Sequence, residues 1–373
     1  MIRFKAKFAV TFLLIIVLLL GACTPQTGTP ATPPAKNPDQ AQQPSEPGKT
    51  AEPNKPDAQK EPNKTQPEVD YNKIKANENG QVMLLMYHGI SSKEEEWVRT
   101  PENFRKDLET LYEKGYRLIT LKDYLDNNIK VEAGYTPVVI TFDDGLQNQF
   151  NIIEENGEKK IDPNCAVGIM EEFKKKHPDF GQGGTFFVYY SLPFRQKELI
   201  KEKYDFLVAN GYEIGNHTYT HENLGKESAE GVQKALALNV KYTQEYLPGY
   251  DVFALALPYG IAPKDEKFKF AISGEYEGIK YNNRAILRVG SNPAPAPNHV
   301  KYDTTRLPRV RASELNTGGV CMYDYLASFD KNPAKRYISD GNPDTIVIPE
   351  EEQENLNKDS IKDKQLITYK KSE

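Results

Sequence analysis

The central part of the chain alternates short apolar runs with amphipathic segments. Runs of strand length occupy residues 82–87, 118–120, 136–142, 184–190, 212–214, 252–257 and 285–289. Apolar residues between them recur every three or four positions, which predicts helices over 101–114, 167–177, 196–210 and 227–246. Thr100 followed by Pro101 is a typical helix start, and Gly115 is a typical stop. Strands that alternate with helices indicate βαβ units and a parallel sheet.

Six or seven such units fit a (β/α) barrel better than an open sheet. In barrels of this kind the residues at the carboxyl ends of the strands carry the chemistry. We assign residues 79–330 to this catalytic domain. Residues 331–373 form a polar C-terminal extension whose structure the pattern does not predict.

The N-terminus has the features of a secretory signal peptide over residues 1–22. Three basic residues precede the apolar run from Val10 to Leu20, and the small residues Gly21 and Ala22 follow. Leu20 to Cys23 resembles a bacterial lipobox, which implies that Cys23 is lipidated and anchors the protein to the cell membrane. An uncleaved membrane anchor is the alternative, and both place the remaining chain outside the cytoplasm.

Residues 23–78 are predicted to be the lipidated cysteine and a disordered, proline-rich linker. Residues 24–70 contain 11 of the 26 prolines and no aromatic residue, so they cannot bury enough apolar surface to fold. The formal net charge of −5 argues against a general nucleic-acid binder, and we expect no nucleic-acid partner. The two remaining cysteines, Cys165 and Cys321, are either free or form one bridge.

Candidate chemistry lies at two predicted strand ends. Asp143 and Asp144 are adjacent carboxylates, and a metal that pairs with one would leave the other free to act as a base. A simple Asp-Gly turn is the alternative. His217 and His221 are four residues apart and would share one face if the segment were helical. Two histidines and one aspartate suit Zn²⁺ or a similar divalent ion, whereas chance surface histidines are the alternative.

These motifs resemble those of the polysaccharide deacetylases of NodB homology. Thr141 to Gly145 reads T-F-D-D-G, and His217 to His221 reads H-T-Y-T-H. The resemblance implies a distorted (β/α) barrel of about seven parallel strands. It implies that Asp143 is the catalytic base and that Asp144, His217 and His221 hold one divalent metal ion. Zn²⁺ is the expected ion, with Co²⁺, Ni²⁺ or Mn²⁺ as alternatives.

Two positions depart from the family pattern. Where the family has R-x-P-Y, this chain has Ala256 to Tyr259, so the arginine that orients the catalytic aspartate is missing. Arg306 and Arg309 are the candidates to replace it, although surface roles are equally compatible with the sequence. Pro258 and Tyr259 match the rest of that motif, which places the oxyanion-binding backbone N–H of the family at Tyr259.

The family's C-terminal acid histidine is also absent, since no histidine follows His299. Leu85 to His88 resembles the displaced motif of the permuted poly-N-acetylglucosamine deacetylase branch. His88 also follows an apolar strand, whereas His299 lies in a proline-rich loop. We therefore expect His88 to be the general acid, because imidazole can donate a proton to a departing amine near neutral pH.

The sequence thus predicts a metal-dependent hydrolase that removes N-acetyl groups from an N-acetylglucosamine-containing polysaccharide. The substrate is peptidoglycan or an exopolysaccharide, and the lipid anchor makes the membrane a second partner. An O-acetyl xylan esterase and a catalytically inactive glycan-binding lipoprotein are the alternatives. The missing arginine favours the inactive protein, whereas the intact Asp143 and metal-ligand set favour the enzyme.

Overall fold

A computed structural model of the chain describes residues 69–361 and 363–372. The predicted signal peptide, Cys23 and all but the last residues of the linker lie outside this range. Within the described residues, every helix is too short or too polar to cross a membrane.

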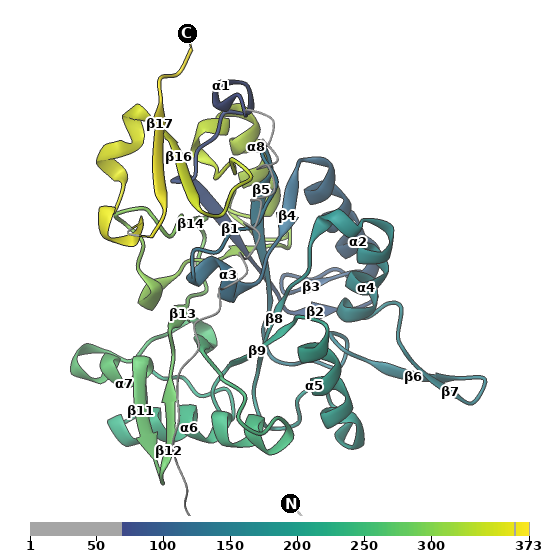
Figure 1. Ribbon diagram of the computed structural model, residues 1–373. Helices are drawn as coiled ribbons and strands as arrows, with labels where there is room; N and C mark the ends of the chain where they lie inside the picture. The colour runs from purple at the N-terminus through teal and green to yellow at the C-terminus, as the bar shows by residue number, and fades with distance from the viewer. Residues whose placement is uncertain (1–68, 362, 373) are drawn as a thin grey trace, which may run out of the picture. The chain divides into compact units, whose positions relative to one another are not determined.

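Seven parallel strands form the curled sheet around which the domain is built (Figure 1). In spatial order they are β13 (Ala285–Leu287), β10 (Ala254–Ala256), β9 (Glu213–Asn216), β8 (Thr185–Val188), β5 (Thr136–Phe142), β1 (Gln81–Tyr87) and β15 (Val310–Arg311). A parallel bridge between Leu287 and Leu307 links the segment before β15 back to β13. The two edges of the sheet therefore meet, and the predicted distorted (β/α) barrel of about seven strands is confirmed.

Both faces of the central strands are buried because the barrel has an inner and an outer core. Along β1, Val82 and Leu84 belong to the inner core, which they share with residues of β10 and β13. Met83, Leu85 and Tyr87 belong to the outer core, beneath the helices. Successive side chains of a strand point to opposite faces. Every second residue of a strand therefore faces the inner core, up to the carboxyl end of the strand, where the candidate site lies.

The longer helices cover the outer core. They are α2 (Pro101–Glu113), α4 (Ala166–Lys176), α5 (Ile200–Ala209), α6 (Ala229–Tyr246) and α8 (Met322–Lys331), with α1 (Tyr71–Ile74), α3 (Leu121–Leu125) and α7 (Lys269–Ile272) as short turns. In α2 the predicted start is confirmed, because the Thr100 hydroxyl accepts a hydrogen bond from the Asn103 amide at 3.1 Å and Pro101 occupies the first turn. Figure 1 shows α2, α4 and α5 along one side of the sheet.

Several short strands lie outside the seven. They are β4 (Tyr116–Leu118), β14 (Ala294–Pro295) and the pairs β2 (Gly89–Ile90) with β3 (Val98–Arg99), β6 (Ile152–Glu155) with β7 (Glu158–Ile161), and β11 (Ser273–Tyr276) with β12 (Ile279–Asn282). The predicted strand at 118–120 corresponds to β4, which pairs with the start of β5 and forms one further bridge, from Leu118 to Gly181. The seventh barrel strand is instead the segment before and within β15, which the sequence analysis missed. Pro308 interrupts that apolar run, so it does not have the pattern of a buried strand.

The C-terminal extension contains a parallel pair, β16 (Thr345–Pro349) and β17 (Gln365–Tyr369), which Figure 1 shows beside α1. One buried carboxylate, Glu78, joins this pair to the residues that precede β1. It accepts hydrogen bonds from the Val347 amide at 2.8 Å, the Asp340 amide at 3.3 Å and the Tyr337 hydroxyl at 3.1 Å. The main chain of the extension is thus fixed to the start of the barrel.

The two cysteines of the described region are both free and buried. Cys165 caps the start of α4, and Cys321 precedes α8. Of the two possibilities left open by the sequence, the structure thus shows separate thiols. Stability of the described domain rests on its packed cores and hydrogen bonds.

Candidate active site

Side chains from four barrel strands converge at the carboxyl end of the inner face. His88 is in phase with Val82 and Leu84 of the inner core, and Arg309 is in phase with Leu307. The same alternation brings Asp143 to this face after β5 and His217 after β9. Residues that are far apart in sequence thus meet above one core.

Asp143 and Arg309 form a buried, bidentate ion pair at the centre of the site. The two guanidinium nitrogens of Arg309 lie 2.7 Å from the two carboxylate oxygens of Asp143. Both side chains are almost inaccessible, at 0% and 1% exposure. Burial opposes the charged form of Asp143, but the Arg309 guanidinium outweighs it and holds the pKa of this carboxyl below its usual range. Asp143 is therefore an ionised carboxylate held in one orientation.

Arg309 is itself fixed by the barrel wall. Its Nε donates to the backbone oxygen of Arg288 at 3.1 Å, and its Nη1 also donates to the Thr141 hydroxyl at 3.1 Å. Thr141 in turn donates to the backbone oxygen of Leu85 at 2.8 Å. Arg309 thus occupies the position beside the catalytic aspartate that Ala256 cannot fill. The other candidate, Arg306, lies over the ring of Phe268, 5.5 Å from its centroid, and does not contact Asp143.

Asp144, His217 and His221 form a compact group of three possible metal ligands. Asp144 Oδ1 lies 3.4 Å from the Nε2 atom of each histidine, and one ligand atom from each residue falls within 4.8 Å of the others. His217 Nδ1 lies 2.8 Å from the backbone oxygen of Ala256, which leaves Nε2 directed at Asp144. The spacing and the donor types fit one divalent ion with a mixed nitrogen and oxygen ligand set.

The segment from His217 to His221 is a loop and not the helix that the spacing allowed. Thr218 and His221 have φ values of 63°, which no helix contains. Asn239 of α6 holds this loop by donating to the backbone oxygens of Val188 and Thr218, both at 2.7 Å. The two rings still approach each other, with centroids 4.9 Å apart. Their shared orientation comes from the loop and α6 rather than from helical periodicity.

His88 follows β1, which neighbours β5 on the side away from β8 and β9. Its Nε2 is 3.9 Å from Asp143 Oδ2, and burial lowers the pKa of its imidazole while the charge of Asp143 opposes that shift. Trp97 packs against it, with ring centroids 4.9 Å apart. The Gln149 side chain donates to the backbone oxygens of both His88 and Asp143, which fixes the ends of β1 and β5 together.

Pro258 and Tyr259 follow β10 at the edge of the site. Tyr259 has a φ of 58°, a conformation that is rare for a residue with a side chain. Its ring is 61% exposed and packs edge-on against His221, with centroids 4.6 Å apart. The turn therefore lies directly beside the metal-ligand group. His299, by contrast, lies in the loop that bridges to Leu356 and takes no part in this cluster.

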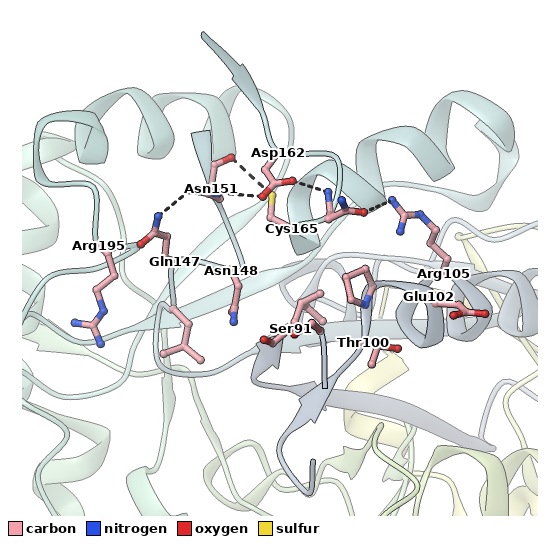
Figure 2. Close-up of a pocket in the computed structure, with 15 residues that line it drawn as sticks. Ser91, Thr100, Glu102, Arg105, Gln147, Asn148, Asn151, Asp162, Cys165 and Arg195 are labelled. Carbon is pink, nitrogen blue, oxygen red and sulfur yellow. Dashed lines mark hydrogen bonds between the residues drawn. The ribbon is translucent and has the colours of Figure 1, made fainter. Parts of the chain in front are cut away.

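A cavity of about 870 Å³ is lined in part by residues that follow β2 and β5, and none of the clustered side chains lines it (Figure 2). One wall, from Ser91 to Arg105, follows β2 and includes the start of α2. The other wall includes Gln147 and Asn148, which follow β5, and Arg195, which follows β8. Most lining side chains are polar, and the charged ones are Glu102, Arg105, Asp162 and Arg195. The cavity thus has a polar surface.

A family model matches the central part of the chain. Residues 130–271 match the family model described as polysaccharide deacetylase. Over that part of the chain the predicted resemblance to the polysaccharide deacetylases, and with it the predicted class of enzyme, is confirmed.

Solved structures of that class are similar to this chain at low sequence identity. The Streptococcus pyogenes deacetylase PplD, solved with acetate, is 18% identical, with a TM-score of 0.48 over 66% of this chain and 97% of that one. The polysaccharide deacetylase BC0361 from Bacillus cereus is 18% identical, with a TM-score of 0.47 over 66% and 68%. IcaB from Ammonifex degensii is 17% identical, with a TM-score of 0.43 over 70% and 99%.

The structure therefore brings together seven of the residues named from the sequence: Asp143, Asp144, His217, His221, His88, Arg309 and Tyr259. The sequence analysis missed Thr141 as a ligand of Arg309, and Gln149 and Asn239 as the amides that fix the loops. Thr141 is the first residue of the T-F-D-D-G motif, so its contact with Arg309 could have been considered from the sequence. A single amide side chain on a helix or loop has no distinguishing pattern, so the other two could not.

Proposed function

We propose that the protein is a metal-dependent deacetylase that hydrolyses N-acetyl groups of an N-acetylglucosamine-containing polysaccharide. The observation that carries this proposal is the ionised Asp143, clamped by Arg309 between His88 and the Asp144, His217 and His221 group. Such a centre has a base, an acid and a cation site next to one another. These are the groups that amide hydrolysis requires.

In this proposal Asp144, His217 and His221 hold the divalent ion, with Zn²⁺ as the expected metal. When bound, the ion polarises the acetyl carbonyl and lowers the pKa of water. The hydrogen bond between His217 Nδ1 and the backbone of Ala256 fixes the tautomer that presents Nε2. Asp144 remains separate from Asp143 because its φ of 78° turns it out of the strand direction.

Asp143 acts as the general base. It takes a proton from the attacking water as the new carbon–oxygen bond to the acetyl carbon forms. Arg309 keeps the carboxylate charged, and the two hydrogen bonds hold both oxygens in one plane. A base that is always ionised and cannot rotate is ready to accept a proton at neutral pH.

His88 acts as the general acid. As the carbon–nitrogen bond breaks, the imidazole gives its proton to the sugar nitrogen, so the products are acetate and a free amine. Its position near Asp143 supports this step, because acid and base then face the same acetyl group. The backbone N–H of Tyr259, in its strained turn, is our candidate to hold the negative oxygen.

Acetate release from matched substrates tests this function. We expect release from N-acetylglucosamine oligomers or peptidoglycan glycan, and no comparable release from acetylated xylan. Faster release from xylan would favour the O-acetyl esterase, and no release from any substrate would favour the inactive glycan-binding protein. His217→Ala should also lose the metal, measured by elemental analysis, whereas a metal that survives loss of both histidines would contradict the ligand set.

We also propose that the mature protein is a lipoprotein outside the cytoplasm, anchored through Cys23. Leu20 to Cys23 after an apolar run supports this. Cys23→Ser should move the protein from the membrane fraction to the soluble fraction. Retention of that variant in the membrane would point to an uncleaved anchor.

A further inference from the structure

Among the described residues, Lys203 is the one lysine whose side chain is buried, with 0% exposure on the inner face of α5. Burial disfavours a charged ammonium and lowers the pKa of Lys203 to about 8. Within the described part of the chain no carboxylate pairs with it, and its nitrogen donates to the backbone oxygen of Phe194 at 2.8 Å. The proposed catalytic steps do not use this ammonium, so its burial calls for another explanation.

The backbone that Lys203 binds is strained. Phe194 and Arg195, in the loop after β8, have φ values of 54° and 61°, in the left-handed region that favours glycine. Two such residues in succession persist only where neighbouring groups hold them. The Phe194 oxygen belongs to the peptide that joins them, and its other partner is the Gln196 amide of the same turn. Lys203 is therefore the group outside the loop that binds this peptide oxygen.

The same turn contacts the loop that carries Asp144. The Phe194 amide donates to the backbone oxygen of Gly145 at 2.7 Å, and Gly145 directly follows Asp144. Asp144 and Gly145 are also left-handed, with φ values of 78° and 58°. Phe194 thus connects two unusual turns, because its amide binds one and its carbonyl is held by Lys203. The ammonium is linked to Asp144 through two hydrogen bonds.

We propose that Lys203 is a positioning residue for the metal-ligand group, because its hydrogen bond to Phe194 fixes the loop from which Asp144 presents its carboxylate. The inference rests on the proposed function, in which Asp144, His217 and His221 hold the divalent ion. Asp144 Oδ1 lies 3.4 Å from the Nε2 atom of each histidine, so a shift of this loop changes the distances to both. A site on loops is only as precise as the contacts that fix those loops.

The affinity for Zn²⁺ tests this role in the metal-free protein, without reference to catalysis. Lys203→Met keeps an unbranched side chain and removes the ammonium. We expect the Kd for Zn²⁺, measured by competition with a chromogenic chelator, to rise about tenfold in this variant. If Lys203 acted through its charge alone, its removal would instead strengthen the binding of a cation. An unchanged or lower Kd would overturn the proposal.

Lys201→Met and Leu207→Ala, both in α5, are the matched controls. Lys201 is exposed and pairs with Asp205 at 2.7 Å, so its replacement removes a lysine charge that does not bind the loop. Leu207→Ala removes buried apolar volume, so it lowers the melting temperature and removes no hydrogen bond. Both should leave the Kd for Zn²⁺ within about twofold. A rise in Leu207→Ala equal to that in Lys203→Met would show that affinity follows stability, and would overturn the positioning role.

Relief of the backbone strain gives a second, independent test. Glycine adopts a φ of 61° without the strain that Arg195 carries, so the turn then needs less support. Arg195→Gly in the Lys203→Met background should therefore recover most of the lost affinity, and it also favours folding if Lys203→Met alone unfolds. A double variant that binds Zn²⁺ no better than Lys203→Met would overturn the proposal.

Hydrogen exchange distinguishes failure of this inference from failure of the proposed function. In the metal-free protein, the amides of residues 144–149 and 194–196 should exchange faster in Lys203→Met than in Leu207→Ala. If the protein binds no Zn²⁺ and releases no acetate, the catalytic proposal fails, whereas faster exchange still shows that Lys203 fixes these loops. Equal exchange in the two variants would overturn the inference, whatever the metal result.

Discussion

Two buried carboxylates of this domain, Asp143 and Glu78, have opposite electrostatic properties. Both side chains are almost fully buried, at 1% and 2% exposure. The charge of Arg309 outweighs burial and keeps the pKa of Asp143 below its usual range. Among the residues that the structure describes, Glu78 accepts hydrogen bonds from neutral donors and forms no ion pair, and burial together with the charge of Asp340 raises its pKa to about 8. Burial is similar in the two places, so the cationic partner makes the difference.

The two carboxylates together show why a buried catalytic base such as Asp143 needs its ion pair with Arg309. Three hydrogen bonds from neutral donors do not keep Glu78 ionised against desolvation and a second carboxylate. A bidentate guanidinium does so for Asp143. The same chemical group therefore joins a strand pair to the barrel in one region and can accept protons in the other.

The largest expected effect comes from removing the charge of Asp143. Asp143→Asn keeps the side-chain size but cannot accept a proton, so activity should fall about 10²–10⁴-fold. The metal content should remain near one per chain, because Asp144 and the histidines are the expected ligands. Steady-state kinetics and elemental analysis check both outcomes. Full activity in this variant would mean that the roles of Asp143 and Asp144 are reversed or wrong.

The next effect concerns the other group that faces Asp143. His88→Ala should reduce hydrolysis of N-acetyl substrates about 10²-fold, because the departing amine then lacks a proton donor. An acetate ester with a good leaving group needs little protonation, so its hydrolysis should fall much less. Rates on an amide and an ester, measured side by side, check this. Equal losses on both would indicate that His88 positions the substrate and does not act as an acid.

Arg309→Gln makes the catalytic carboxylate resemble Glu78. Without the guanidinium, burial raises the pKa of Asp143, so the base is ionised only at higher pH. We expect about a tenfold loss of activity near pH 7, partly recovered as the pH rises, and a lower free energy of unfolding by about 3–5 kcal/mol. The acid limb of the pH–rate profile should move upward. A loss that is the same at every pH would contradict the electrostatic role.

The catalytic region was more predictable than the Glu78 region, for a physical reason. The side chains around Asp143 follow apolar strands, and the alternation of a strand fixes which of them meet at its end. Arg309 was only one of two candidates, because Pro308 interrupts the apolar pattern of the strand that carries it. Glu78 precedes β1 and has no pattern around it, since its partners Asp340 and Val347 are more than 250 residues away. Contacts between such distant, non-periodic segments cannot be inferred from one sequence.

The smallest expected effect is on stability and tests Glu78 itself. Because the pKa of Glu78 in the folded protein is about 8, against 4.5 as the ordinary value, the native state holds one more proton than the unfolded state between these pH values. Stability from this group is therefore present at low pH and is lost as the pH rises toward 8. The expected slope is at most about 1.4 kcal/mol per pH unit.

Glu78→Gln is the matched variant, because its amide stays neutral at every pH. The free energies of unfolding of the two proteins should be compared between pH 6.5 and 8. Burial raises the pKa of Asp107 to about 6, so this group titrates below the window. Burial lowers the pKa of Lys203 to about 8, so this group affects stability above the window. Groups that do not interact with Glu78 contribute equally to both proteins and cancel in the difference. Denaturant unfolding across this window should show a falling free energy in the natural protein and a flatter one in Glu78→Gln. Parallel curves would mean that Glu78 is ionised in the folded state, so that neutral donors alone can hold a buried carboxylate without the cation that Asp143 has.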